Sequence, residues 1–182
     1  MKNSLLLLPF GLMALLSSCS SVLIPEPLVS TTEPELREEL EGVWLVEEGA
    51  IHVAFTEKGQ GEIAFIEREE EKFKLERGEL AAVVFDDRTY LSVRFEEDGE
   101  MMEKYYLAEF KTDDSGNLIA WPADVDRFGK AVNDGELEGV IEKSKYSTVI
   151  ELKSDNAALL RFLTQNPDGV ATRSPIVLRK LK

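Results

Sequence analysis

Residues 79–95 read ELAAVVFDDRTYLSVRF, and this stretch decides the fold. Its first part, residues 80–85, is an unbroken apolar run of the length of a strand that is buried on both faces. Asp86 and Asp87 then mark a tight turn. In residues 89–95, apolar and polar side chains alternate with a period of two, which is typical of a strand with one buried face. The stretch therefore predicts a β-hairpin.

The same alternation continues on both sides of this hairpin, with turn signals in between. We expect turns at residues 58–61, 77–78, 86–87, 98–99 and 114–117. We expect further strands at residues 51–55, 63–65, 73–75 and 106–110. Strands at roughly 8–12-residue spacing with tight turns predict an antiparallel meander, as a curled sheet or a small barrel.

About three short helices accompany the strands. Thr32, Glu35 and Pro34 form a capping-box pattern that predicts a helix over 33–40. The last third predicts one helix that ends at Gly135 and another that starts at Ser154. The remaining strands of this part are expected at residues 118–121, 139–142, 148–152 and 176–181. The fold class is therefore mainly β with late helices, and the order of the last elements also occurs in ferredoxin-like folds.

The chain is strongly acidic, with 35 acidic and 21 basic residues and a formal net charge of −14. Such a surface repels phosphate backbones, so we expect no nucleic-acid partner. The length fits one domain with a substantial core. We assign residues 32–182 to a single β-rich globular domain.

The amino terminus has the parts of a secretory signal. Lys2 gives a positive start, and the apolar stretch 5–16 is too short to span a bilayer comfortably. This stretch ends in Leu16-Ser17-Ser18-Cys19, which resembles the lipobox of bacterial lipoproteins. Cys19 is the only cysteine of the chain.

The resemblance implies a lipid anchor. In lipoproteins the signal peptide, here residues 1–18, is cleaved before the cysteine, so cleavage is expected between Ser18 and Cys19. The Cys19 sulfur would carry a diacylglyceryl group, and the new amino terminus would usually be acylated as well. An ordinary secretory signal, with Cys19 as a bystander, is the alternative.

The residues after the anchor suggest a location and a tether. Ser20, in place of an aspartate, is similar to lipoproteins that are sorted to the outer membrane of the bacterial envelope. Residues 19–31 contain Pro25 and Pro27 and predict a lipidated tether. The same segment also holds apolar side chains, so part of it could pack on the domain instead.

A second resemblance starts at the β-region. Gly42-Val43-Trp44 is similar to the Gly-x-Trp pattern that opens the first strand of lipocalins. That resemblance implies an eight-stranded barrel in which the tryptophan packs at the closed end under a late basic residue. Arg179, on the last expected strand, could supply the basic group.

The sequence contains no catalytic motif. His52 is the only histidine, which excludes a multi-histidine metal site, and its strand pattern predicts a partly exposed sheet residue. Residues 67–72 are expected in a solvated turn or helical cap, and residues 112–117 in a hairpin turn rather than a calcium loop. We expect no cofactor, metal or catalytic residues, while Trp44, Trp121, Tyr105 and Tyr106 are candidates for core, cavity or surface recognition.

Three functions remain open. The first is a non-catalytic envelope lipoprotein that binds a protein partner or serves a structural role. The second is a lipocalin-like carrier of a small apolar ligand. The third, less favoured, is a hydrolase that uses a pair of carboxylates.

Overall fold

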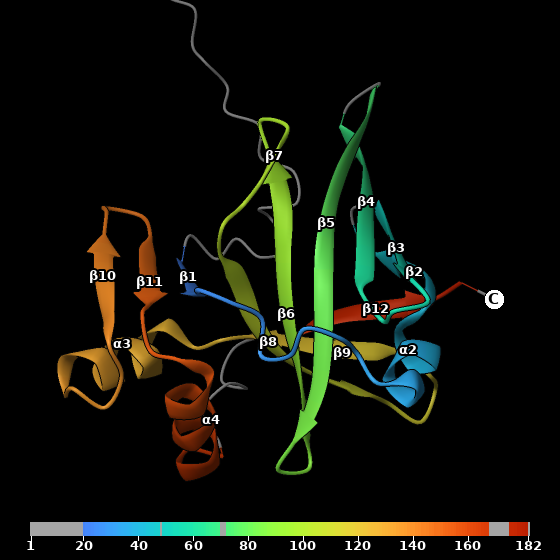
Figure 1. Ribbon diagram of the computed structural model, residues 1–182. Helices are drawn as coiled ribbons and strands as arrows, with labels where there is room; N and C mark the ends of the chain where they lie inside the picture. Colours follow the sequence, from blue (N-terminus) through green and yellow to red (C-terminus); the bar gives the residue numbers. More distant parts are fainter. Residues whose placement is uncertain (1–19, 48, 70–71, 168–174, 182) are drawn as a thin grey trace, which may run out of the picture.

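The structure is a computed structural model that describes residues 20–47, 49–69, 72–167 and 175–181. Eight antiparallel strands close into a barrel, which confirms the predicted mainly β fold and small barrel (Figure 1). In order around the barrel they are β2 (Gly42–Val46), β3 (Gly49–Phe55), β4 (Gly61–Glu69), β5 (Lys72–Phe85), β6 (Arg88–Glu97), β8 (Tyr105–Thr112), β9 (Leu118–Pro122) and β12 (Ile176–Lys180).

The barrel is a meander that the last strand closes. From β2 to β6 each strand pairs with the next one along the chain, and β8 then lies between β6 and β9. Strand β12 pairs with β9 on one side and with β2 on the other, where Lys180 lies opposite Trp44. The two-residue strand β7 (Glu100–Met101) extends the turn after β6.

Inward-facing side chains of alternate positions form the barrel core. Helix α2 (Pro34–Leu40) covers one end of the barrel, and its Leu36 and Leu40 join this core. The buried barrel residues with which they cluster are Trp44, Ile51, Val53, Phe65, Leu80, Ala82, Phe110, Leu118 and Leu178. Full burial of such a side chain contributes about 1.5–3 kcal/mol each, so this cluster holds the strands together.

A second core lies against the outer wall of the barrel. It is built by β1 (Ser20–Ile24), β10 (Gly139–Lys143), β11 (Thr148–Leu152), α3 (Val125–Asn133) and α4 (Asn156–Gln165). Figure 1 shows these elements on one side of the barrel and α2 on the other. Strand β5 contributes Leu80 and Ala82 to the barrel core, while its Val83 and Phe85 pack against the second core. This is why residues 80–85 form an unbroken apolar run, although Val84 is exposed.

The expected tether is part of the fold. Ser20 to Ile24 form β1, which pairs in parallel with β11 and in antiparallel with the start of β8. Val22, Leu23, Ile24 and Leu28 are buried. Of the two alternatives for residues 19–31, packing on the domain therefore applies to these four residues, and Val22, Ile24 and Leu28 belong to the second core.

The turn expected at Arg77 and Gly78 is also wrong. Strand β5 runs through both residues without a break and pairs with β4 and β6 along its length. A Cβ atom at Gly78 would lie 2.2 Å from the carbonyl oxygen of Arg94. The glycine therefore permits a close approach of two strands, a role that the sequence does not distinguish from a turn.

Two predicted helix caps serve other purposes. The hydroxyl of Thr32 accepts a hydrogen bond from the backbone N–H of Ala82 at 2.9 Å, and α2 has no side-chain cap. The hydroxyl of Ser154 accepts from the N–H of Glu138, while Asp155 caps α4. Each hydroxyl thus accepts a hydrogen bond from the backbone of a segment that is distant in the sequence.

The ferredoxin-like order of the last third does not lead to a ferredoxin-like sheet. Strand β9 pairs with β12 in the barrel, whereas β10 pairs with β11 beside β1. Among the described residues, no helix combines the length and the apolar character that crossing a bilayer requires.

Candidate functional site

The barrel has one closed end, which α2 and Trp44 fill. The Trp44 side chain is 1% exposed, and its Nε1–H donates to the carbonyl oxygen of Leu40 at 2.8 Å. The Nζ atom of Lys180 lies 5.0 Å from the centre of the Trp44 ring and donates to the carbonyl oxygen of Glu39 at 3.2 Å. The tryptophan thus joins the first barrel strand, the last barrel strand and the helix.

This arrangement corrects one detail of the lipocalin-like expectation. The cation over Trp44 belongs to Lys180, and Arg179 lies opposite Leu45 on the other face of the same strand. A strand turns successive side chains to opposite faces, so only one of these two neighbours can reach the barrel core.

At the other end of the barrel, solvent reaches the inward-facing apolar side chains. Six of them are only partly buried, and they come from five strands. They are Val46, Ile63, Val93, Phe95, Ala120 and Ile176. We call these six side chains, together with the polar ones described next, the barrel mouth. A partly exposed apolar surface inside a closed sheet is the kind of surface that small apolar ligands bind.

Five polar side chains belong to the barrel mouth, namely Glu67, Lys74, Glu76, Glu97 and Tyr106. Glu67 lies opposite Lys74, and Glu76 lies opposite Phe65. Glu97 and Glu76 are both close enough to Tyr106 to act on its hydroxyl electrostatically. Lys74 Nζ lies 2.5 Å from Glu76 Oε1. Glu67 is only 8% exposed, so the solvated turn expected for it is wrong at this position. The mouth thus combines an apolar wall with a net negative set of polar groups.

Tyr106 links the apolar and polar parts of the mouth. Its ring centre lies 6.2 Å from that of Phe95. Burial raises the pKa of the Tyr106 hydroxyl, and the negative charges of Glu97 and Glu76 raise this pKa further. The hydroxyl therefore stays protonated at neutral pH and can donate a hydrogen bond, while the carboxylates can accept one.

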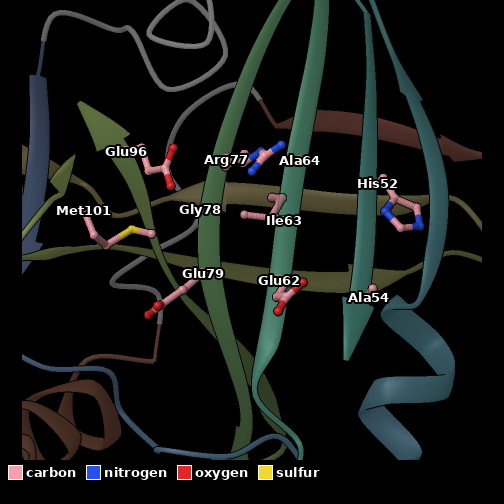
Figure 2. Close-up of a pocket in the computed structure, with 10 residues that line it drawn as sticks. All are labelled: His52, Ala54, Glu62, Ile63, Ala64, Arg77, Gly78, Glu79, Glu96 and Met101. Atoms are coloured by element: carbon pink, nitrogen blue, oxygen red, sulfur yellow. The ribbon is translucent and has the colours of Figure 1, made fainter. Parts of the chain in front are cut away.

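A separate groove of about 370 Å³ lies on the outer wall of the barrel (Figure 2). Ala54 and Ala64 line the groove from the neighbouring strands β3 and β4, and their small side chains leave space above the sheet. Cross-strand pairing places His52, Ala64 and Arg77 in one row across β3, β4 and β5. The residues around the groove are His52, Ala54, Glu62, Ile63, Ala64, Arg77, Gly78, Glu79, Glu96 and Met101.

The groove is lined by charged side chains and one histidine. His52 is exposed, as predicted for a strand residue, and none of the described residues that line the groove is a serine, threonine or cysteine. Within the described ranges, no group of three or more histidine, cysteine or acidic side chains is placed to hold a metal ion.

The other residues singled out in the sequence occupy defined places. Tyr105 and Tyr106 face opposite sides of β8, the former in the second core and the latter in the barrel mouth. Trp121, on β9, lies under Lys111 Nζ at 5.4 Å from its ring centre. The lipobox residues Leu16 to Cys19 lie outside the described residues.

The polar residues of the mouth were not predicted from the sequence. Phe65 is inward-facing, and a period of two from Phe65 places Glu67 on the same face. That period could have predicted an inward-facing position for Glu67. The charged run of residues 67–72 instead indicated a solvated turn.

No protein-family model, curated protein or solved structure matches the chain.

Proposed function

We propose that the protein is a membrane-anchored, non-catalytic binding protein of the bacterial envelope, and that its barrel carries a small, largely apolar ligand. The observation that carries this proposal is the barrel mouth, where six apolar side chains of a closed barrel remain accessible to solvent. The other end of the barrel is filled by Trp44 and α2, so the ligand enters from the mouth.

The polar groups of the mouth favour a ligand with a particular polar end. Among the described residues of the mouth, Glu67, Glu76 and Glu97 supply three carboxylates, and Lys74, which pairs with Glu76, supplies one ammonium group. A ligand whose polar end donates hydrogen bonds, or carries a positive charge, matches this set better than a fatty acid does. Its apolar part would lie between Phe95, Val93 and the walls of the barrel.

The anchor is the second part of the proposal. The resemblance of Leu16-Ser17-Ser18-Cys19 to a lipobox supports acylation of Cys19, and Ser20 supports sorting to the outer membrane. Two or three acyl chains would make the attachment effectively permanent, because a buried methylene contributes about 0.8 kcal/mol. A binding barrel held in this way would collect or deliver its ligand close to the membrane.

Catalysis is not part of the proposal. A serine–histidine pair would have to use His52, which faces the outer groove, away from the barrel interior. The polar groups of the mouth are positioned to recognise a ligand, and a second function as a protein-binding module would use the outer wall instead.

The ligand proposal is tested by the mass of the protein as it is extracted from its own membranes. We expect the native mass of the full mature chain to exceed its denatured mass by that of a small molecule. A variant that fills the mouth, Ala120→Trp or Ile176→Trp, should lose this extra mass. Ala64→Trp, which fills the outer groove, serves as the matched control and should keep it. Loss of the ligand in Ala64→Trp alone, or no extra mass in the wild type, would contradict the proposal.

The anchor is tested separately. The denatured mass should include the acyl groups on Cys19, and Cys19→Ser should prevent their attachment. A mature chain without acyl groups would show that the lipobox resemblance is misleading, whatever the barrel binds.

A further inference from the structure

The first described residue is held firmly by the fold. Ser20 lies opposite Thr148 in the parallel pairing of β1 with β11, and its Oγ accepts a hydrogen bond from the N–H of Thr148 at 3.1 Å. Two residues further on, Val22 is fully buried in the second core. Ser20 is therefore itself part of the domain, and no linker separates the two.

This geometry places the domain against the membrane if Cys19 is acylated, so the inference rests on the proposed anchor. Cys19 is the neighbour of Ser20, and consecutive Cα atoms are about 3.8 Å apart. The lipid would thus be attached within one residue of a strand. Whatever part of the surface surrounds Ser20 must face the lipid headgroups.

The surface next to Ser20 is the tip of the β10–β11 hairpin. Thr148 pairs with Ser20 on one side and with Lys143 on the other, so the three residues lie in one row. Figure 1 shows their strands β1, β11 and β10 next to one another. Strands of a sheet are about 4.8 Å apart, which places the backbone of Lys143 roughly 10 Å from that of Ser20. The tip between the strands is closed by a hydrogen bond from the N–H of Ser144 to the carbonyl oxygen of Ser147.

The side chains of this tip are locally basic, although the chain as a whole is acidic. Residues 143–148 read KSKYST and contain two lysines and no acid, although the chain holds 35 acidic residues. Tyr146 is 74% exposed, and Lys145 Nζ lies 4.9 Å from the centre of its ring. The nearest acids on the two strands are Glu142, which is exposed, and Glu151, which pairs with Lys104 at 2.5 Å.

We propose that the tip of the β10–β11 hairpin, with Lys143, Lys145 and Tyr146, is a lipid-binding element that rests on the headgroup surface beside the anchor. Tyrosine is enriched at membrane interfaces because its ring is apolar and its hydroxyl is polar. Lysines close to an anionic surface are attracted to it, and their stems reach along the interface. Three elements, the lipid, Tyr146 and the lysine pair, would fix the orientation of the barrel on the membrane.

A fluorescent label on the acylated full chain tests this contact. Once Cys19 is acylated, Tyr146→Cys provides a single free thiol for an environment-sensitive dye such as nitrobenzoxadiazole. Ser115→Cys is the matched control, because Ser115 is exposed in the turn after β8, at the end of that strand remote from β1. Both proteins are placed in vesicles of phosphatidylethanolamine and phosphatidylglycerol that contain spin-labelled lipid as a quencher.

We expect a blue-shifted emission at position 146 and quenching several times stronger than at position 115. Lys143→Gln with Lys145→Gln should reduce the quenching at 146 when phosphatidylglycerol is present. Equal quenching at 146 and 115 in an acylated protein would overturn the proposed contact and leave the anchor intact. A mature chain whose mass shows an unmodified Cys19 would instead overturn the anchor, and with it the reason for placing the hairpin on the membrane.

Discussion

One buried hydroxyl, that of Thr32, and one exposed cation, that of Lys180, hold the closed end of the barrel together. Thr32 is 1% exposed and accepts the N–H of Ala82, which lies 50 residues further along the chain. The loop before α2 is thereby tied to a central strand of the barrel. Lys180 has a comparable role, because it joins the last barrel strand to Trp44 and to the end of α2.

Replacing Thr32 by valine should destabilise the fold. The valine keeps the shape of the side chain but leaves the N–H of Ala82 without its acceptor, and an unsatisfied buried donor costs about 1–3 kcal/mol. Urea unfolding should show this loss for Thr32→Val. Thr32→Ser keeps the hydroxyl and should retain more of the stability, so a valine variant that equals or exceeds the serine variant would disprove the role of the hydrogen bond.

Replacing Lys180 by methionine should cost more than the same change at Arg179. Methionine keeps most of the apolar stem but removes the charge over the Trp44 ring, an interaction of about 0.5–1 kcal/mol at partly exposed sites. Arg179 faces the outer wall and is exposed. Thermal unfolding of the two variants checks the assignment, and equal losses would mean that Lys180 has no special place in the barrel.

At the scale of the element, we expect substitution by alanine to have opposite effects on stability at Gly78 and at Gly129. A Cβ at Gly78 would lie 2.2 Å from Arg94 O, whereas a Cβ at Gly129 would lie 3.4 Å from Ile150 Cδ1. Gly78→Ala should therefore force β5 and β6 apart and destabilise the barrel. Gly129→Ala adds a better helix former to α3 in ordinary contact, so it should be neutral or stabilising by up to about 1 kcal/mol. Chemical denaturation of both variants gives the comparison, and two alanine variants of equal stability would refute the close approach at Gly78.

The turn between β8 and β9 should depend on pH through Asp113. The side-chain amide of Asn117 is the largest cause of the lowered pKa of the Asp113 carboxyl, and the backbone N–H groups of Asn117, Ser115 and Gly116 add to it. Because this pKa is lower in the folded state, the stabilisation is present above the ordinary pKa of aspartate and is lost as the pH falls through the folded value.

An NMR titration of the carboxyl group checks this. The midpoint for Asp113 should lie below the ordinary aspartate value in the wild type and should rise in Asn117→Ala. An unchanged midpoint in that variant would show that Asn117 does not hold the charge.

The elements were largely predictable from local patterns, and the exceptions have physical reasons. The helix over 33–40 and the turn at Asp86 and Asp87 follow from local signals, and both aspartates have the positive φ that such a turn requires. Gly78 was misassigned as part of a turn. The sequence alone does not distinguish a glycine that permits two strands to approach closely from a glycine that reverses the direction of the chain. Thr32 was misassigned as a cap because its partner lies 50 residues away, beyond any local pattern.

At the scale of the whole molecule, the barrel and the second core share the wall formed by β5, β6 and β8. In the described part of the chain, the sheet of β1, β10 and β11 is joined to the barrel by the strand pairing of β1 with β8, by the ion pair between Lys104 and Glu151, and by apolar packing. The side sheet carries Ser20, the neighbour of the proposed anchor Cys19, whereas the mouth belongs to the barrel. The proposed membrane attachment and the proposed ligand binding would therefore use different parts of one structure.

The candidate site was only partly predictable. The sequence pointed to a barrel and to Trp44 at its closed end, because Gly42-Val43-Trp44 is a local pattern. It did not show which residues line the mouth, since this depends on how the strands pair around the barrel. Glu67 and Glu76 face inward by register alone, and in the sequence they are two carboxylates among 35 acidic residues.

The most direct test of the central claim is a binding titration with N-phenyl-1-naphthylamine, a neutral apolar dye whose fluorescence rises in an apolar site. We expect saturable binding of one dye per chain in the ligand-free wild type and in Ala64→Trp, and little or no binding in Ala120→Trp and Ile176→Trp that remain folded by circular dichroism. Unchanged binding in the folded mouth variants, or its loss in Ala64→Trp, would show that the barrel mouth is not the ligand site.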